Sequence, residues 1–417
     1  MRSRLDALKP AALRRAPGVS GGAVRLGLLG RFTDELFSGL PFVLMPTIGA
    51  TLGFAYPAVG LLTLVLTFTA AIIEPFSALV LDVWSRHRLM AWGALGTGLS
   101  LVVIGVAPDY VWLIAGFALY GTASGPLAHT ADVVLVESHP EDPARIVARG
   151  TVLDTIGALL GPLLVALGFW LGLDWRWMLV AIGLWGPVYA VLLIRTHFPK
   201  PPPRTAPSTP LVAELRENLR TVLSSRPAIA WLLFLFALEL AEAPALLHPL
   251  WLAGEVGMSQ PIVGLYVAFD LAVGLLGVAS LDRWLSRTSA RTVIRTSLLG
   301  LVLLYPLWFA IPGAAAKFLI GAPLAFLFST LWPIGRGESL ASVPGRAGAV
   351  TALSALTGFV PLTLAVALLA EAFGATTAML SVHLLGVGLM LTTLRWLPVD
   401  RRSTSPDAAA ANEVHPE

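Results

Sequence analysis

The sequence contains no cysteine. This absence excludes disulfide bonds, thiolate catalysis, cysteine-ligated zinc and iron–sulfur clusters. Charged residues are also scarce, because Asp, Glu, Lys and Arg make up 13% of the 417 residues, whereas soluble domains carry about 25%. Hydrophobic residues make up 56%, and the mean hydropathy is +0.78. These values exclude a soluble enzyme and a nucleic-acid-binding protein, and they predict an integral membrane protein.

Motifs for hydrolytic and ATP-driven chemistry are absent as well. The chain has no Walker loop, no HExxH sequence and no nucleotide-binding domain. We therefore expect no cofactor, no metal site and no enzymatic activity, and transport driven directly by ATP is not supported. Residues 1–20 are basic but lack a continuous apolar core, so they predict a cytoplasmic tail rather than a signal peptide.

Long apolar runs are what the chain has instead. Twelve runs of about twenty residues, the length needed to cross a bilayer as a helix, are separated by Pro, Gly or charge clusters. Each run is apolar on every face and about twice as long as a membrane β-strand, and a helix satisfies its own backbone hydrogen bonds in lipid. The sequence therefore predicts an all-α integral membrane protein with twelve transmembrane helices. The expected spans are 24–51, 57–81, 88–107, 111–136, 149–172, 177–195, 228–252, 261–281, 292–312, 315–333, 347–370 and 374–397.

The basic residues fall on one side of these spans. With the N-terminus inside, all but three of the 28 Lys and Arg residues lie in inward segments. Arg176 and Lys317 are left outside, and Arg31 lies within the first span. By the positive-inside rule, we expect both termini in the cytoplasm and a multi-pass protein of the cell inner (cytoplasmic) membrane.

A proline-rich stretch divides the spans into two sets of six. His197 to Pro210 reads HFPKPPPRTAPSTP, which favours a stiff extended linker. Apolar residues at helical spacing from Leu211 to Val222 then predict an amphipathic helix, either on the membrane surface or as a solvated connector. The expected segments are a cytoplasmic N-terminal tail (1–23), an N-terminal six-helix bundle (24–198), a cytoplasmic linker with the amphipathic helix (199–227), a C-terminal six-helix bundle (228–397) and a disordered cytoplasmic tail (398–417).

The two sets of spans contain matching short sequences. Pro57-Ala-Val-Gly-Leu is followed 204 residues later by Pro261-Ile-Val-Gly-Leu, and Glu35-Leu is followed by Glu239-Leu at the same distance. A parallel repeat of six helices predicts two pseudo-symmetric bundles, with a substrate path between them near the membrane midplane.

These features resemble the major facilitator superfamily of secondary transporters. The family carries Gly-x-x-x-Asp-Arg-x-Gly-Arg-Arg between its second and third helices, and this chain reads Ala78-Leu-Val-Leu-Asp82-Val-Trp-Ser-Arg86-His-Arg88. A weaker copy begins at Asp282. The resemblance covers the whole membrane portion, and it implies the twelve-helix fold of that family and transport by alternating access.

The same motif implies a cytoplasmic gate. We expect Asp82 to accept hydrogen bonds from the N-terminal amides of a facing helix, and Arg86 to pair with Glu137 or, as the alternative, with Asp132. Such a network forms in the outward-open state and breaks in the inward-open state. The expected gate residues are Asp82, Arg86, Arg88, Glu137 and Asp282.

The fifth span carries Gly157-Ala-Leu-Leu-Gly161-Pro162, which is similar to the Gly-x-x-x-Gly-Pro sequence of the family's drug and metabolite antiporters. Small residues one turn apart allow close packing, which we expect across the interface between the halves. Pro162 removes a backbone hydrogen bond, so that the helix can bend there. The fourth span reads Gly116-Phe-Ala-Leu-Tyr120-Gly and lacks the arginine that such antiporters carry.

Several ionisable residues lie within the spans, where a charge costs at least about 2.5 to 3.5 kcal/mol. Arg31 precedes Asp34 and Glu35 by three and four residues, so we expect it to neutralise one of them. Glu239 and Glu242 share one face of the seventh span, which contains no basic residue. A carboxyl removed from water binds its proton more tightly, so these acids either carry coupled protons or remain protonated and hydrogen-bonded to neighbouring helices. The residues expected at the proton-coupling site and substrate cavity are Asp34, Glu35, Glu239, Glu242 and Arg31.

Five further ionisable residues at membrane depth are isolated in the sequence, and for these we expect structural roles. One of them, Asp154, is also a possible partner for Arg31 across the first and fifth spans. The five are Glu74, Asp154, His248, Asp270 and His383.

The sequence thus predicts a secondary active transporter that exports a small organic molecule, such as a drug or metabolite, in exchange for protons. A proton-coupled symporter for uptake would have the same fold and the same acids, and a lipid flippase is a further alternative. The expected partners are a small-molecule substrate, protons and the lipid bilayer, without nucleic acid, and we expect a monomer.

Overall fold

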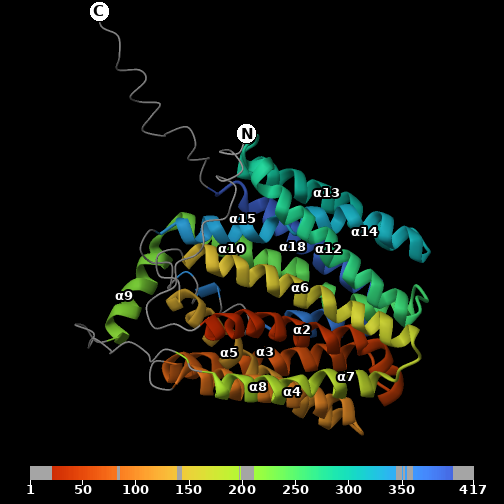
Figure 1. Cartoon of the computed structure of the whole chain (residues 1–417). Coiled ribbons are helices and arrows are strands. Elements are labelled where there is room, and N and C mark those ends of the chain that lie inside the picture. Colours follow the sequence, from red (N-terminus) through yellow and green to blue (C-terminus); the bar gives the residue numbers. More distant parts are fainter. Residues whose placement is uncertain are drawn as a thin grey trace, which may run out of the picture. The chain divides into compact units, whose positions relative to one another are not determined.

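The computed structural model describes residues 21–81, 85–138, 143–196, 198, 211–343, 350, 353–354 and 360–397. Within these ranges all regular secondary structure is helical (Figure 1). The helices up to the linker are α2 (Gly21–Leu52), α3 (Tyr56–Leu81), α4 (Arg86–Val106), α5 (Tyr110–Ser138), α6 (Pro143–Trp170), α7 (Trp175–Gly183) and α8 (Trp185–Arg195). Those that follow are α9 (Leu211–Ser224), α10 (Arg226–Glu242), the 3-10 helix η1 (Ala243–Leu247), α11 (His248–Gly254), α12 (Gln260–Leu285), α13 (Ala290–Ala310), α14 (Ala314–Phe328), α15 (Leu331–Ala341), α17 (Leu362–Phe373) and α18 (Ala375–Thr393).

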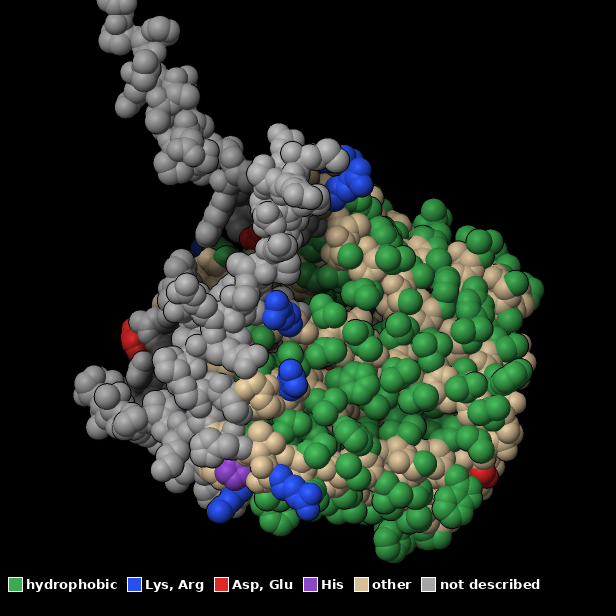
Figure 2. All heavy atoms as spheres, in the orientation of Figure 1, with side chains coloured by type: hydrophobic (Ala, Val, Ile, Leu, Met, Phe, Trp, Pro, Cys, Tyr) green, Lys and Arg blue, Asp and Glu red, His purple; other side chains and the backbone are tan. Residues whose placement is uncertain are grey.

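The expected spans correspond to these helices. Eleven helical stretches of the described chain are long and apolar enough to cross a membrane, and Leu362–Phe373 is a shorter apolar helix inside the expected span 347–370. Three spans are subdivided: α7 continues as α8, α14 as α15, and α10 passes through η1 into α11. Hydrophobic side chains cover the sides of the helices in the view of Figure 2, and the visible Lys and Arg side chains lie toward helix ends.

The chain forms two compact units. The first unit comprises Met1–Thr205 together with Ser259–Ala268, and the second comprises Ala206–Met258 and Phe269–Glu417. The beginning of α12 therefore belongs with the first unit, although the repeat in the sequence assigns it to the second half. The helix that we expected in the linker is α9, and its Val222 is buried against Ala228, Val343 and Val350 of the second unit.

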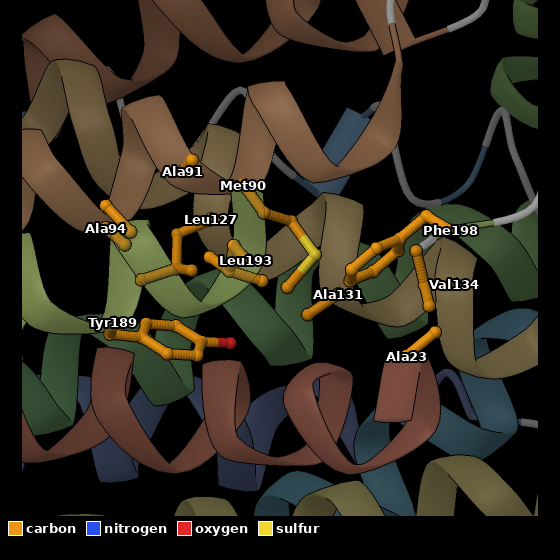
Figure 3. Packing of buried hydrophobic residues seen from close by; sticks show 11 residues of the cluster. Ala23, Met90, Ala91, Ala94, Leu127, Ala131, Val134, Tyr189, Leu193 and Phe198 are labelled. Atoms are coloured by element: carbon orange, nitrogen blue, oxygen red, sulfur yellow. The ribbon is translucent and has the colours of Figure 1, made fainter. Parts of the chain in front are cut away.

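The core of the first unit lies where α2, α4, α5 and α8 meet (Figure 3). Met90, Leu127 and Leu193 are completely buried there. The ring of Tyr189 is also buried, and its hydroxyl donates to the backbone carbonyl of Leu26 at 2.5 Å. Small residues allow these helices to approach closely, because a Cβ added at Gly98 of α4 would lie 2.6 Å from the Cα of Gly186 in α8.

Tight glycine turns connect the helices on the side predicted to face outward. Gly53, which follows α2, has a φ of 73°, and Gly257, which follows α11, has the same value. Only glycine adopts this left-handed conformation without a steric cost. The two turns are 204 residues apart, the same offset as the matched sequences, so the repeat extends to the backbone geometry of the turns.

The two basic residues that the charge pattern left outside both bind the C-terminal end of a helix. Arg176 Nη1 donates to the carbonyls of Ala107 at 2.6 Å and Gly105 at 3.2 Å, at the end of α4. Lys317 Nζ donates to the carbonyls of Trp308 and Ile311, at the end of α13. Helix ends leave carbonyls without intrahelical partners and carry partial negative charge. These two cations are therefore explained by local structure and do not weaken the charge asymmetry.

Lys317 should contribute to stability although it lies in an apolar helix. Its side chain is 1% exposed, and its Nζ lies 5.0 Å from the ring centre of Trp251. We expect Lys317→Met to lower the free energy of unfolding by about 1–3 kcal/mol, because the buried carbonyl of Trp308 and the partly buried carbonyl of Ile311 lose their donor. Thermal unfolding in detergent measures the effect, with Arg295→Met, at an exposed position of α13, as the control. Equal stability of the wild type and Lys317→Met would show that these carbonyls need no cap.

Candidate functional site

Arg31 is the centre of an ion-pair cluster inside the first unit. Its guanidinium binds Asp154 of α6 through two nitrogens, with Nε 2.9 Å from Oδ1 and Nη2 on Oδ2. Its third nitrogen, Nη1, lies 2.8 Å from Oδ2 of Asp132 in α5. The cluster therefore connects α2, α5 and α6 through one side chain. The side chains are partly exposed, at 22% for Arg31, 12% for Asp154 and 36% for Asp132.

This arrangement refines one expectation and supports another. Arg31 interacts electrostatically with Glu35 of its own helix, as expected, but its direct ion pairs are with Asp132 and Asp154 of other helices. The physical reason is the planar fork of the guanidinium, which fits a carboxylate best through two parallel hydrogen bonds. Asp154 of a facing helix offers that geometry.

Asp34 is bound by hydroxyl groups. Its Oδ1 accepts a hydrogen bond from Ser124 Oγ at 2.8 Å and lies 3.4 Å from the hydroxyl of Tyr120. The same Tyr120 hydroxyl also donates to the backbone carbonyl of Asp34 at 3.0 Å. Tyr120 and Ser124 both belong to α5, and Tyr120 is 4% exposed. Within the described ranges, no basic side chain forms a hydrogen bond with this carboxyl.

Glu35, the next residue of α2, lies beside the ion-pair cluster. Its carboxyl is half-buried and interacts electrostatically with Asp154 and with Arg31. The first unit therefore gathers four carboxyls, those of Asp34, Glu35, Asp132 and Asp154, around one guanidinium.

The glycine motif of α6 packs against α2. A Cβ added at Gly157 would lie 3.1 Å from the Leu36 nitrogen, and one added at Gly161 would lie 3.3 Å from the Leu36 carbonyl oxygen. Both glycines therefore face α2, a helix of the same unit, rather than a helix of the other half as expected. The motif holds α6 close to the segment of α2 that carries Asp34 and Glu35. One turn further on, the Pro162 carbonyl lies 2.9 Å from a Cβ built on Gly264, in the part of α12 that belongs to this unit.

One ion pair of the expected gate is present. Arg86, at the start of α4, is 3% exposed, and its Nη2 lies 2.5 Å from Oε1 of Glu137 near the end of α5. The sequence favoured Glu137 over Asp132 for this pair, and that choice is confirmed, since Asp132 binds Arg31 instead. Arg88 is exposed. Asp82 lies outside the described residues, as does the side chain of Asp282.

The acids of the second unit lie at the end of α10. Glu239 is half-buried, Glu242 is exposed, and the two carboxyls interact electrostatically one turn apart. They directly precede η1, where Pro244 interrupts the α-helix. Glu239 thus lies where the helix crossing the membrane changes its geometry.

Sequence analysis missed a cluster of polar rings in the second unit. His248 of α11, Tyr305 of α13 and His383 of α18 come together, with His248 Nε2 2.9 Å from the Tyr305 hydroxyl and the rings of Tyr305 and His383 stacked at 3.6 Å. The sequence marked both histidines as isolated, because the three residues come from three separate helices. It also gave no indication of Tyr120 and Ser124 as partners of Asp34.

The contribution of the Arg31 cluster is measurable by a double-mutant cycle. We expect Arg31→Gln to destabilise the protein by on the order of 2 kcal/mol, less than the roughly 3–5 kcal/mol of a fully buried pair because these side chains are partly exposed. Arg31→Gln combined with Asp154→Asn should lose less than the sum of the single variants, because the double variant leaves no unpaired charge at Asp154. Unfolding in detergent provides the four free energies. Additive effects would contradict a direct ion pair.

The chain was compared with known proteins at the levels of family, curated sequence and solved structure. The model of the Major Facilitator Superfamily matches residues 27–365. No curated protein sequence matches the chain. A solved structure of the nucleoside transporter NupG aligns with a TM-score of 0.72 and 15% identity, over 91% of this chain and 100% of that chain.

A second solved structure is similar to the same extent. It is a bacterial homologue of the human lysosomal transporter Spinster in an inward-facing and unoccupied conformation, with a TM-score of 0.73, 16% identity, and coverage of 90% of this chain and 94% of that chain. At such identities these structures support the fold only. The prediction of an all-α membrane protein with the major facilitator fold is confirmed, and eleven helices of the described chain have the length and composition of membrane spans. The chain belongs to the Major Facilitator Superfamily, and it is a multi-pass membrane transporter rather than an enzyme.

Proposed function

We propose that the protein exports a small organic molecule across the cell inner membrane by alternating access, in exchange for protons, with both termini in the cytoplasm. The observation that carries the proposal is the environment of Asp34. This carboxyl lies on a membrane-spanning helix, and its hydrogen-bond partners are the neutral hydroxyls of Ser124 and Tyr120. The nearest arginine in sequence, Arg31, is already bound by two other acids.

Hydroxyl partners suit a group that gains and loses a proton. A hydroxyl donates to an ionised carboxylate and, after rotating, accepts from a protonated carboxyl. Ser124 can therefore satisfy Asp34 in both states, whereas an arginine would stabilise the ionised state alone. In the stretch where the family's antiporters carry an arginine, this chain has Tyr120, which donates to Asp34. The coupled proton thus has a site on the carboxyl itself.

The balance of charge supports the same interpretation. The four carboxyls outnumber the basic groups that interact with them among the described residues, Arg31 and His129, so a further cation favours their ionised forms. Protons are the simplest such cations. The surplus of carboxyls also favours a positively charged or neutral cargo over an anionic one.

Glu239 is the corresponding carboxyl of the second unit. It follows Glu35 by 204 residues and lies beside Glu242, whose negative charge opposes a second ionised carboxyl nearby. We assign Glu239 and Glu242 to proton coupling together with Asp34 and Glu35. Arg31 fixes α2, which carries Asp34 and Glu35, to α5 and α6.

Arg86 and Glu137 supply one ion pair of the proposed cytoplasmic gate. The pair joins the beginning of α4 to the end of α5. We assign Asp82, Arg88 and Asp282 to the same gate on the basis of the family motif. Movement of the N-terminal bundle against the C-terminal bundle would make and break this network during alternating access.

The proton site is tested by transport in proteoliposomes. With a pH gradient imposed, internal pH is followed together with a panel of labelled cargoes, led by the lipophilic cation tetraphenylphosphonium. We expect Asp34→Asn to bind and exchange cargo but to lose accumulation driven by the gradient, because an amide cannot release a proton. Glu239→Gln should behave in the same way.

The matched control is Asp109→Asn, in the exposed turn before α5. Asp109 Oδ1 accepts from the backbone nitrogens of Val111 and Trp112, and an asparagine oxygen preserves that cap. This variant should transport like the wild type. Accumulation that survives in both Asp34→Asn and Glu239→Gln would place the coupled proton elsewhere. If the wild type moves cargo in the same direction as the protons that flow down the imposed gradient, symport is favoured over export by exchange.

A further inference from the structure

The break between α10 and α11 leaves a backbone carbonyl that a side chain must satisfy. Pro244 has no N–H, so a 3-10 turn that begins at Ala243 offers no backbone donor at that position to the carbonyl of Ala241. His383 of α18 fills this role, with Nδ1 2.8 Å from the Ala241 oxygen. α18 and α10 also pack tightly at this level, since a Cβ added at Gly386 would lie 2.6 Å from the Ala241 nitrogen.

This contact determines the proton arrangement on the imidazole. A carbonyl oxygen only accepts, so Nδ1 of His383 must carry the hydrogen. In the neutral ring Nε2 is then a bare acceptor. Nε2 is buried and forms no hydrogen bond within the described part of the chain, and the whole side chain is 3% exposed. A buried polar atom without a partner is rare and requires an explanation.

The surroundings of His383 are arranged to hold a ring. Tyr305 stacks on it with ring centres 3.6 Å apart and planes inclined by 19°. The Tyr305 hydroxyl is engaged by His248 Nε2 at 2.9 Å, so the phenol is fixed in position. An aromatic face of this kind attracts a cationic ring more strongly than a neutral one.

Each helix around His383 carries at least one titratable or charged group, and these groups set the electrostatic surroundings of the imidazole. Asp270 interacts electrostatically with Tyr305. The groups are Glu239 and Glu242 of α10, His248 of α11, Asp270 of α12, Tyr305 of α13, Lys317 of α14 and Glu371 of α17.

We propose that His383 is a proton-binding site of the second unit, which takes up a proton on Nε2 when the helix break at Ala243–Leu247 opens to water. In the present conformation the site is closed, and a buried imidazolium whose second N–H lacks an acceptor would be costly. Closure therefore favours the neutral ring and expels the proton. Acidic pH must then favour the open form of the break, because the proton binds only there. The carboxyls of the proposed transport cycle are not needed for this behaviour.

Labelling of single cysteines tests the proposal on the purified full-length protein, without cargo and without a gradient. The chain has no cysteine of its own. Ala243→Cys places a thiol at a position that is 7% exposed, and Ala245→Cys places one at an exposed position of the same turn. The ratio of their labelling rates with a water-soluble maleimide cancels the intrinsic pH dependence of the thiol. We expect the ratio to rise several-fold between about pH 8 and about pH 6, where imidazoles gain charge.

His383→Asn is the decisive variant. Its amide nitrogen replaces Nδ1 as donor to Ala241 but cannot bind a second proton, so the fold should persist while the rise in the ratio disappears. His87→Asn, in α4 of the first unit, should keep the rise. A ratio that does not depend on pH in the wild type, or one that still rises in His383→Asn, would overturn the proposal.

An independent measurement uses nitrogen NMR of histidine-labelled protein in detergent. The signal that disappears in His383→Asn should report the tautomer with hydrogen on Nδ1 at about pH 8, because Ala241 accepts from that nitrogen. A signal from the opposite tautomer would show that the geometry on which the proposal rests is absent in solution. This measurement requires neither a cargo nor proton coupling at Asp34, so it tests the proposal for His383 independently of the proposed function.

Discussion

In hydrocarbon a backbone carbonyl has no water to bind, so every carbonyl that a helix cannot satisfy needs another donor. Several buried polar side chains of this transporter serve that need. Arg176 and Lys317 bind the carbonyls at the ends of α4 and α13, Tyr189 binds Leu26, and His383 binds Ala241 at the break before α11. This constraint determines where polar groups occur in the membrane. A polar atom at membrane depth that satisfies no backbone carbonyl, or that keeps an unused hydrogen-bonding site after doing so, therefore indicates a role other than structural support.

Asp34 and His383 are two titratable groups whose hydrogen bonding exceeds this structural need. The carboxyl of Asp34 accepts from hydroxyls that tolerate either protonation state, and the imidazole of His383 keeps one nitrogen without a partner among the described residues. Arg31 shows the opposite case. All three nitrogens of its guanidinium are hydrogen-bonded to Asp154 and Asp132, so its direct ion pairs are with these two acids. The position of one arginine thus decides which nearby carboxyl is available for proton transfer.

Features that depend on local sequence could be predicted. Hydropathy located the spans because a bilayer requires about twenty apolar residues per helix, and the repeat predicted two halves. Two pairs between distant segments were among the candidates, Glu137 as the favoured partner of Arg86 and Asp154 as a possible partner of Arg31, because a buried charge needs an opposite charge and few lie at the right depth. The break at η1 was less visible, since the hydropathy of 228–252 is continuous and only Pro244 marks it.

Features that depend on packing between distant segments could not be predicted. Asp34 and Ser124 are 90 residues apart, and Ala241 and His383 are 142 apart, so no sequence spacing relates them. A hydroxyl or an imidazole in an apolar helix has no unique partner until the helices are placed. The glycines of α6 illustrate the same limit, because small residues at helical spacing indicate that a helix approaches closely but not which one. Here the partner is α2.

The two units therefore share a backbone plan but differ in part of their interior chemistry. The turns at Gly53 and Gly257 keep the offset of the repeat, which shows that the common architecture extends to single residues. The polar groups in the interior keep it only in part: Glu239 repeats Glu35, but the guanidinium cluster of Arg31 belongs to the first unit, and the imidazole of His383 stacked on Tyr305 belongs to the second. A carboxyl is neutral when it holds its proton, and an imidazole is charged when it holds one. The proposed proton sites of the two units, Asp34 and His383, therefore carry opposite changes of charge: the first becomes neutral and the second becomes positive when a proton binds.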